Sequence, residues 1–457
     1  MKSFRKGIFY REMADINGAM PRRQLTLFPF IAAIFFMVSG GPYGLEEIIQ
    51  KAGYSRALLI LAVVPFVWSF PVALMVGELS AALPEEGGYY MWVRRALGPF
   101  WGFQEAWLSL SASVFDMALY PTLFVLYLGQ LWPAAAAGHH AFVVGAAVVA
   151  ACALWNIAGI KAVGEGASLM MLALLAPFAI LAVMCLLHSP AGSAPAAPMT
   201  SINLLGGIVI AMWNYMGWDN ASTVAGEVRN PQRNYPRALL GAVALVIACY
   251  LIPVAALAKS GMDSSGFTTG SWVTIAGQIS GPTLGWMIVL GGMICGFGMN
   301  NALVLSYSRV PYAMAKDGML PSVLSKTNRK GVPWISVVLC AVAWTACLPL
   351  GFDRLIAIDI LVYALSLLLE FAALIALRIR EPQLTRPFKI GGGIPALILV
   401  TLGPTFVLIL ALVENGREYV AGAPVLALGA MVALAGIMVY PFVSRAKGLF
   451  LNQSKSE

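Results

Sequence analysis

Hydrophobic residues along this chain gather in uninterrupted stretches of about 20 residues, the length that an α-helix needs to cross the roughly 30 Å hydrocarbon core of a bilayer. Polar and charged residues are largely confined to the short segments between these stretches. The pattern predicts an all-α membrane protein with twelve transmembrane helices and no sizeable extramembrane domain. The predicted spans are residues 28–50, 57–83, 99–131, 138–159, 163–187, 202–227, 238–258, 283–308, 333–351, 355–377, 395–413 and 424–443.

The composition indicates a surface that faces lipid. Of the 457 residues, 60% are hydrophobic and 11% are charged, whereas a soluble globular chain carries about 25% charged residues. So few charges cannot cover a water-facing surface, and most of the surface must therefore meet the bilayer. This excludes a soluble enzyme, a disordered protein and a nucleic-acid-binding protein, and it makes the lipid bilayer the main partner of the chain.

The 29 lysines and arginines are distributed unevenly over the two sides that the predicted spans define. If the first residue lies in the cytoplasm, 24 of them face the cytoplasm and five face outward, namely Lys51, Arg56, Lys259, Arg354 and Arg417. Cytoplasmic loops are normally enriched in Lys and Arg, and the asymmetry therefore favours twelve spans with both termini in the cytoplasm. The net charge of +8 then reflects membrane topology.

Cysteine and histidine are too few and too scattered to indicate catalysis. The six cysteines lie inside apolar stretches without a CxxC pair, and the three histidines, His139, His140 and His188, fall at predicted helix ends. Nucleophilic catalysis and metal sites need clusters of such groups. We therefore expect no enzyme activity, no metal and no cofactor.

Two predicted spans contain residues that interrupt a helix at mid-membrane depth. They are residues 39–44, Ser-Gly-Gly-Pro-Tyr-Gly, in the first span and residues 214–220, Asn-Tyr-Met-Gly-Trp-Asp-Asn, in the sixth. Backbone groups freed by Gly and Pro are tolerated in a bilayer only where they face protein, water or a ligand. Breaks in spans five apart are typical of transporters built from inverted repeats, which bind substrate where the breaks meet. The alternative is that these glycines only permit close helix packing.

These segments resemble the amino acid, polyamine and organocation (APC) transporters. The resemblance rests on residues 212–222 (MWNYMGWDNAS) with 226–236, on 40–46 (GGPYGLE), on 98–105 (GPFWGFQE), on 116–121 (DMALYP), and on 369–388. It covers about residues 28–413 and is strongest for polyamine uptake transporters and L-type amino acid transporters. It implies a protein of the plasma (inner) membrane that works by alternating access.

The resemblance also implies an organisation of the chain. A cytoplasmic N-terminal segment, 1–27, precedes a five-helix repeat at 28–188 and an inverted five-helix repeat at 202–379. Two additional helices at 391–443 and a cytoplasmic tail at 444–457 follow. The resemblance further implies that Trp213 is the aromatic lid over bound substrate. Asp219 occupies the position of a proton-sensing acidic residue in arginine/agmatine exchangers, where L-type exchangers usually have asparagine.

Acidic residues inside the spans are candidates for function, because an ionised carboxylate near the bilayer centre costs about 2.5–3.5 kcal/mol. Asp219 lies at the second break, Glu46 just after the first break, and Asp116 in the middle of the third span. We predict that all three bind substrate and that Asp219 also couples protons. Their alternative roles are a helix cap for Asp219, outer-surface solvation for Glu46 and an interhelical hydrogen bond for Asp116. The predicted substrate-binding set is completed at the breaks by Gly40, Gly41, Tyr43, Gly44, Trp213 and Tyr215.

Three further carboxylates, Glu78, Glu227 and Glu370, approach the predicted cytoplasmic ends of their spans. Arginines are available at these ends, and we therefore expect gate or structural ion pairs there rather than substrate contacts. Two other acidic residues, Glu105 and Asp359, have no evident role in the sequence.

The predicted acidic cavity would repel an anionic substrate. Amino acid transporters of this type hold the substrate carboxylate on free N–H groups at the first break, and here Pro42 removes one such donor. A cationic or zwitterionic amine is therefore favoured: a polyamine such as putrescine or spermidine first, and an amino acid second.

The energy source is predicted to be the proton gradient. No lysine occurs between Lys161 and Lys259, so the mid-fifth-span lysine of some proton-driven relatives is absent. We expect proton-coupled uptake through a carboxylate, with obligatory exchange as the alternative. A channel and a membrane receptor are the competing classes. The sequence carries no signal for oligomeric state.

Overall fold

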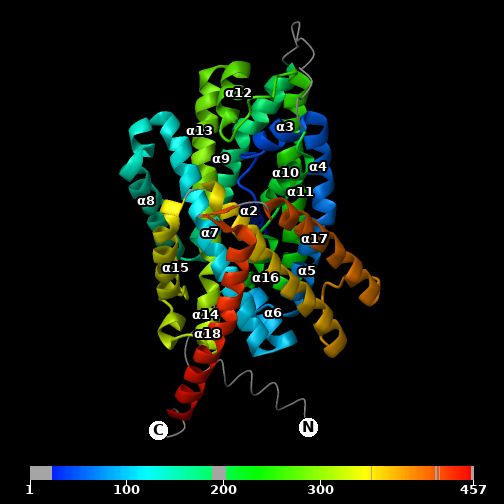
Figure 1. Ribbon diagram of the computed structural model, residues 1–457, viewed down its shortest axis with the longest axis vertical. Helices are drawn as coiled ribbons and strands as arrows, with labels where there is room; N and C mark the ends of the chain where they lie inside the picture. Colours follow the sequence, from blue (N-terminus) through cyan, green and yellow to red (C-terminus); the bar gives the residue numbers. More distant parts are fainter. Residues whose placement is uncertain (1–22, 188–201, 351, 417–418, 421, 454–457) are drawn as a thin grey trace.

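The computed structural model describes residues 23–187, 202–350, 352–416, 419–420 and 422–453. They form a bundle of helices, with one two-stranded hairpin, β1 (Tyr419–Val420) and β2 (Ala423–Pro424), as the sheet within these ranges (Figure 1). Residues 1–22 of the predicted N-terminal segment 1–27, residues 188–201 with His188, and residues 454–457 of the predicted tail lie outside the described residues.

The helices are α2 (Leu27–Val38), α3 (Glu46–Ala52), α4 (Tyr54–Val67), α5 (Ser69–Ala82), α6 (Gly88–Leu97), α7 (Pro99–Leu131), α8 (Gly138–Ile157), α9 (Ile160–Leu187), α10 (Leu204–Asn214), α11 (Pro231–Ser260), α12 (Ser271–Ser280), α13 (Pro282–Tyr307), α14 (Arg309–Lys316), α15 (Trp334–Cys347), α16 (Phe352–Arg380), α17 (Gly393–Asn415) and α18 (Val425–Gln453). Short 3-10 helices are η1 (Pro133–Ala136), η2 (Trp218–Thr223), η3 (Ala225–Glu227), η4 (Ser322–Ser325) and η5 (Leu348–Leu350).

Within the described ranges, nine helical segments are long and apolar enough to cross a membrane. They correspond to nine of the twelve predicted spans, with α4 and α5 forming one segment and α13 and α14 another. The other three predicted spans contain shorter helices. Residues 28–50 divide into α2 and α3, residues 202–227 divide into α10 and η2, and residues 333–351 contain the 14-residue α15.

The two predicted helix breaks are present. Helix α2 ends at Val38, and none of the next seven residues is α-helical before α3 begins at Glu46. Helix α10 ends at Asn214, and the chain continues through Gly217 into η2. Both breaks lie in the interior of the bundle, where neighbouring helices supply partners for the freed backbone groups.

Two short helices cover opposite ends of the bundle (Figure 1). Helix α12 lies next to α3 at one end, here named the α12 end, and α6 lies near α14 at the other, here named the α6 end. Both have ten residues, both follow a glycine in the left-handed conformation, Gly87 and Gly270, and both stop at a second glycine. Each is followed directly by a long helix that starts with proline.

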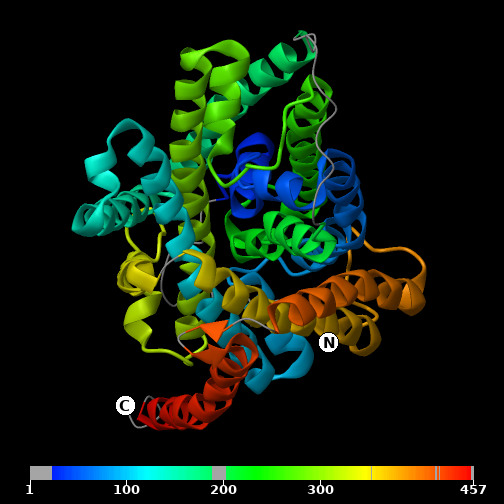
Figure 2. The same ribbon diagram turned by 45° about the horizontal axis from the view of Figure 1, so that its top comes forward.

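The long helices α7 and α16 lie side by side in the centre of the bundle (Figure 2). A direct contact between the Ser109 and Ser366 hydroxyl oxygens, 2.8 Å apart, joins the two helices. Helices α17 and α18 lie at the periphery, and few of their side chains are buried within the chain, which suits contact with lipid.

Candidate functional site

The first break is held by its own side chains. The Gly41 N–H donates to Ser39 Oγ at 3.1 Å, and the Gly44 N–H donates to Glu46 Oε2 at 2.7 Å. Gly41 and Gly44 both have φ near +90°, which glycine adopts without steric cost. The other oxygen of Glu46 accepts the Gly270 N–H at 3.0 Å, and the side chain thus fastens the start of α3 to the start of α12.

The second break touches the first. Gly217 has a φ of +96°, and a Cβ atom at this position would lie 2.4 Å from the carbonyl oxygen of Met37, at the end of α2. The Gly217 N–H donates to the Tyr363 hydroxyl at 3.3 Å, and this hydroxyl donates to Asp219. A tyrosine of α16 therefore joins the Gly217 backbone to the buried carboxylate of Asp219 within the second break.

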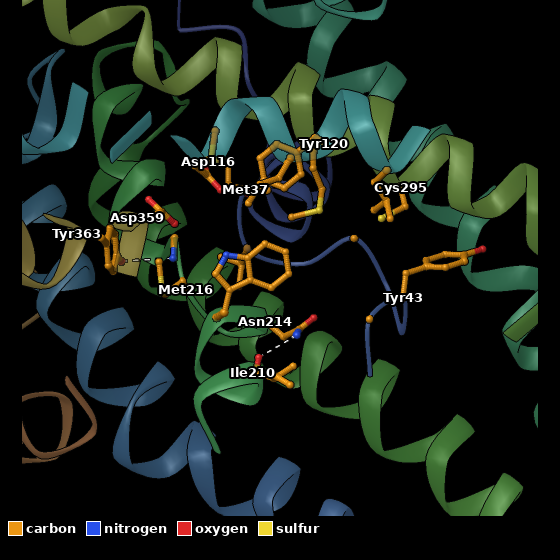
Figure 3. A pocket seen from close by; sticks show the side chains of 18 of the residues that line it. Met37, Tyr43, Asp116, Tyr120, Ile210, Asn214, Met216, Cys295, Asp359 and Tyr363 are labelled. Carbon is orange, nitrogen blue, oxygen red and sulfur yellow. Dashed lines mark hydrogen bonds between the residues drawn. The ribbon is translucent and has the colours of Figure 1, made fainter. Parts of the chain in front are cut away.

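A cavity with an open mouth lies between the two breaks (Figure 3). Helices α7, α13 and α16 complete its wall, and Thr269 and Glu47 line it towards the α12 end. The lining residues are Met37, Val38, Gly40, Tyr43, Gly44, Glu47, Asp116, Leu119, Tyr120, Leu123, Val209, Ile210, Trp213, Asn214, Met216, Gly217, Asn220, Thr269, Cys295, Met299, Tyr307, Asp359 and Tyr363.

Three carboxylates line this cavity, and none of the described lining residues is Lys, Arg or His. Asp116 accepts hydrogen bonds from the Tyr120 hydroxyl and, at 3.4 Å, from the Tyr307 hydroxyl. Asp359 is buried, and its Oδ2 atom has no hydrogen-bond partner among the described residues. Figure 3 shows Asp116 and Asp359 on the side of the cavity near Tyr363, away from Tyr43 and Cys295. The arrangement is suited to a positively charged ligand.

Five of the nine predicted substrate-binding residues line the cavity: Gly40, Tyr43, Gly44, Asp116 and Trp213. The Trp213 side chain is half-buried and lies on the last turn of α10. Gly40 is tightly packed, because a Cβ atom there would lie 2.1 Å from Cys295 Sγ.

The other four predicted residues, Gly41, Glu46, Tyr215 and Asp219, are behind this wall. Gly41 faces Leu174, and Glu46 holds the first break as described above. Tyr215 is fully buried and donates to the Leu61 carbonyl at 3.0 Å. Asp219 is 2% exposed and does not line the cavity, but it accepts a hydrogen bond from the hydroxyl of Tyr363, which does line it.

Residues that the sequence analysis left without a role also line the cavity. Asp359 is the clearest, and its signal was visible as a carboxylate within an apolar span. Tyr120, Tyr307 and Tyr363 were not separable from other aromatic residues of the spans, because their position depends on which faces of α7, α13 and α16 meet.

Ion pairs close the bundle at the α6 end. Arg378 binds Glu78 with two hydrogen bonds, of 2.5 and 2.6 Å, and the Arg386 Nε lies 3.3 Å from the same carboxylate. Glu227 binds Arg309 at 3.0 Å. The ion pairs predicted for Glu78 and Glu227 are thus present.

The ion pair predicted for Glu370 is wrong: neither of its carboxylate oxygens has a hydrogen-bond partner among the described residues. Arg378, two helical turns further on, binds Glu78 and the Ile390 carbonyl instead.

A multi-pass helical bundle with an acidic cavity between two broken helices is the architecture of a membrane transporter. Comparison with known proteins identifies the family. The sequence profile of the amino acid permeases matches residues 31–439, and the chain belongs to this family, within the APC transporters. It is an integral, multi-pass membrane transporter and not an enzyme.

Named relatives include plant and bacterial proteins. The chain is 34% identical to the polyamine transporter RMV1 of Arabidopsis thaliana over 84% of its own length and 79% of that protein. It is 32% identical to the polyamine transporter PUT1 of Oryza sativa subsp. japonica over 97% and 84% of the two chains. It is 26% identical to the serine/threonine exchanger SteT of Bacillus subtilis over 88% and 91%.

Proposed function

We propose that this protein transports a polyamine or similar organic dication through the cavity between the two breaks. The observation that carries the proposal is the charge of the cavity wall, where Glu47, Asp116 and Asp359 meet no basic side chain among the described lining residues. Putrescine and spermidine carry separated ammonium groups, and each group can bind a carboxylate while the tyrosine and tryptophan rings cover the alkyl chain. The similarity to named polyamine transporters supports this substrate class.

The first break is poorly prepared for a substrate carboxylate. Two of its N–H groups, those of Gly41 and Gly44, already donate to Ser39 and Glu46, and Pro42 has no N–H. Glu46 also places a negative charge at the N-terminus of α3, where the helix dipole would otherwise attract an anion. The first break therefore offers few free N–H groups to the carboxylate of an amino acid, whereas an amine needs none of them.

In this proposal Asp116 and Asp359 bind ammonium groups, and the predicted residues take the following parts. Trp213 covers the bound substrate, while Gly40, Tyr43 and Gly44 shape the wall opposite. Glu46 and Gly41 keep the first break in its conformation, and Tyr215 fixes the second by its bond to Leu61. Asp219, through Tyr363, links the second break to the cavity and remains the proposed proton-coupling residue.

We also propose that the chain crosses the membrane twelve times, as two inverted five-helix repeats, 28–188 and 202–379, followed by two helices at 391–443. The matching of α6 with α12 supports the repeat: each follows the second helix of its repeat, has the same length and glycine borders, and covers the opposite end. Each also touches a break, since Tyr89 N donates to Ser222 Oγ while Gly270 N donates to Glu46.

The α6 end is then cytoplasmic. Under the twelve-span assignment most Lys and Arg residues belong to this side, which places both termini in the cytoplasm and suits a plasma (inner) membrane protein. In alternating access, α6 would move outward and the ion pairs at the α6 end would break when α12 closes the opposite end.

The substrate proposal is tested with purified protein and a panel of ligands. Putrescine and spermidine at 100 times their dissociation constant should stabilise the fold by about 2.7 kcal/mol, seen as a rise in melting temperature. Asp116→Asn and Asp359→Asn should lose this rise, while Glu165→Gln, which changes an exposed carboxylate of α9, should keep it. Stabilisation by serine and threonine but not by polyamines would overturn the proposal in favour of an amino acid carrier.

Coupling is proposed to be proton-driven uptake, and amino acid or amine exchange is the second candidate because of the similarity to the exchanger SteT. Uptake of labelled putrescine into proteoliposomes should rise when an inward proton gradient is imposed. Uptake that ignores the gradient and requires internal substrate would establish exchange instead. Steady, non-saturating flux would indicate a channel.

A further inference from the structure

A second group of carboxylates lies between α7 and α16, outside the substrate cavity. The Ser109–Ser366 contact sets the register of the two helices. Seven residues away on each helix are Asp116 and Asp359, which line the cavity, and four residues away in the opposite direction are Glu105 and Glu370. The 11-residue spacing places the two pairs on the same helix faces, about 16 Å apart along the axes. Glu105 and Glu370 are on the α6-end side.

Glu105 and Glu370, here named the inner pair, lack the partners that a buried charge needs. Glu105 and Glu370 are both 0% exposed. Glu105 Oε1 accepts from Ser109 at 2.7 Å and from Ser366 at 3.0 Å, but its Oε2 atom has no partner among the described residues. Both oxygens of Glu370 are without a partner in the part of the chain that the structure describes.

Among the described residues, the other helices packed on α16 leave no unpaired positive charge beside the pair. Helix α6 contributes Tyr89, and its two arginines pair elsewhere, Arg94 with Asp317 and Arg95 with Glu381. The 3-10 helix η2 contributes Asp219, which is an electrostatic neighbour of Glu105 and Glu370. Glu78 of α5 is bound to Arg378 and Arg386. The one charged residue of α17, Glu414, accepts from Asn203, and the sequence of α18 has none before Arg445.

Burial without a counter-ion requires a neutral group. An ionised carboxylate costs about 2.5–3.5 kcal/mol at the membrane centre even on the lenient insertion scale, and more when a second carboxylate lies beside it. Glu105 has two hydroxyl donors that can stabilise a charge, whereas Glu370 has none. We propose that Glu105 and Glu370 form a proton-binding site separate from the substrate cavity, with the proton held on Glu370 in this conformation.

The site is placed to couple protons to transport, a step that rests on the proposed function. Asp219 is an electrostatic neighbour of Asp116 and Asp359 at the cavity and also of Glu105 and Glu370. The Tyr89 backbone N–H donates to Ser222 of η2, and the buried Tyr89 side chain is an electrostatic neighbour of Glu105 and Glu370. Movement of α6 away from η2 would admit water from the α6 end. Glu370 would then release its proton to that water and become a carboxylate. The next proton must come from the opposite side, through the cavity when it is open at the α12 end, so that each cycle carries one proton from the α12 end to the α6 end.

The protonation of Glu370 is tested first, in the absence of substrate. Infrared spectra of purified wild-type protein at pH 7 should show a carboxylic-acid C=O band that Glu370→Gln removes and that Glu165→Gln leaves unchanged. Because an amide resembles a protonated carboxyl, Glu370→Gln should be as thermally stable as wild type at pH 7. If that variant does not fold, Glu370→Met, neutral and of similar length, replaces it. A spectrum unchanged in the variant would overturn the proposal, whichever substrate the protein carries.

Coupling is tested in proteoliposomes with the membrane voltage held at zero. A gradient of one pH unit can support about tenfold accumulation of putrescine for each proton carried. Glu370→Gln should lose this accumulation while keeping counterflow of labelled for unlabelled putrescine. Accumulation that persists in the variant would overturn the coupling role. Absence of putrescine transport by wild type would contradict the proposed function, and the infrared result would still decide whether the site binds a proton.

Discussion

The contact between the two breaks is best tested at Gly217, where replacement by alanine adds a single methyl group. Two costs follow from the structure. The φ of +96° is strained for any residue with a Cβ atom, which costs about 1–2 kcal/mol. The new Cβ atom would also lie 2.4 Å from the Met37 carbonyl oxygen, a backbone atom that cannot rotate away. Moving the two breaks apart adds about 1–3 kcal/mol, typical of overpacking a filled interior.

Gly331 provides the matched control, because it has a similar φ of +82° and nothing within 4 Å of its Cβ position. Gly331→Ala pays the conformational cost alone. Melting of both purified variants should therefore show a small loss of stability for Gly331→Ala and a loss about twice as large or more for Gly217→Ala. Gly217→Ala should also lose the melting shift produced by putrescine, since Gly217 lines the cavity. Equal melting temperatures for the two variants would refute a close contact between the breaks.

Four further substitutions test the remaining parts of the structure. Glu46→Gln keeps one of the two oxygens that accept the Gly44 and Gly270 N–H groups and leaves the other N–H facing an amide NH2, which should cost about 1–3 kcal/mol of stability. An unchanged melting temperature would show that Glu46 does not hold the first break. Arg378→Gln leaves the buried Glu78 with a weaker set of partners and should cost up to about 3–5 kcal/mol, whereas the same change at the exposed Lys161 should have no measurable effect. Trp213→Leu should weaken putrescine binding in a radioligand assay without lowering stability, and unaltered affinity would argue against its role as a lid. In the loop before α6, burial and the nearby Glu227 carboxylate raise the pKa of Glu86 to about 7. The folded state therefore binds this proton more tightly than the unfolded state, and a rise in pH from about 4.5 to 7 destabilises the fold. Glu86→Gln should reduce the loss of stability measured between pH 6 and pH 8.

Sequence reasoning was most successful where a local signal was strong. The long apolar segments, the breaks at residues 39–44 and 214–220, and the ion pairs of Glu78 and Glu227 are all present in the structure. Each depends on composition over a few residues, such as glycine and proline within an apolar run or a carboxylate near arginines at a helix end.

It was less successful for the wall of the cavity. Glu46 and Asp219 were expected on that wall because they lie beside the breaks, but neither lines it. Asp359 does line the cavity although nothing in its local sequence distinguishes it from Glu370, 11 residues later on the same helix face. Adjacency in sequence does not tell which way a side chain turns once the backbone leaves the helix.

The sequence by itself determined that the chain is a membrane protein and where its two special helices break, because hydrophobic length and the backbone chemistry of glycine and proline are local properties. It also indicated an acidic interior. The tertiary structure decided which carboxylates share a space: the register of α7 against α16 places Asp116 and Asp359 at the cavity and leaves Glu105 and Glu370 together without a counter-ion. The sequence shows which carboxylates lie within the apolar spans, but the energetic cost and the role of each one depend on which groups the packed helices place beside it.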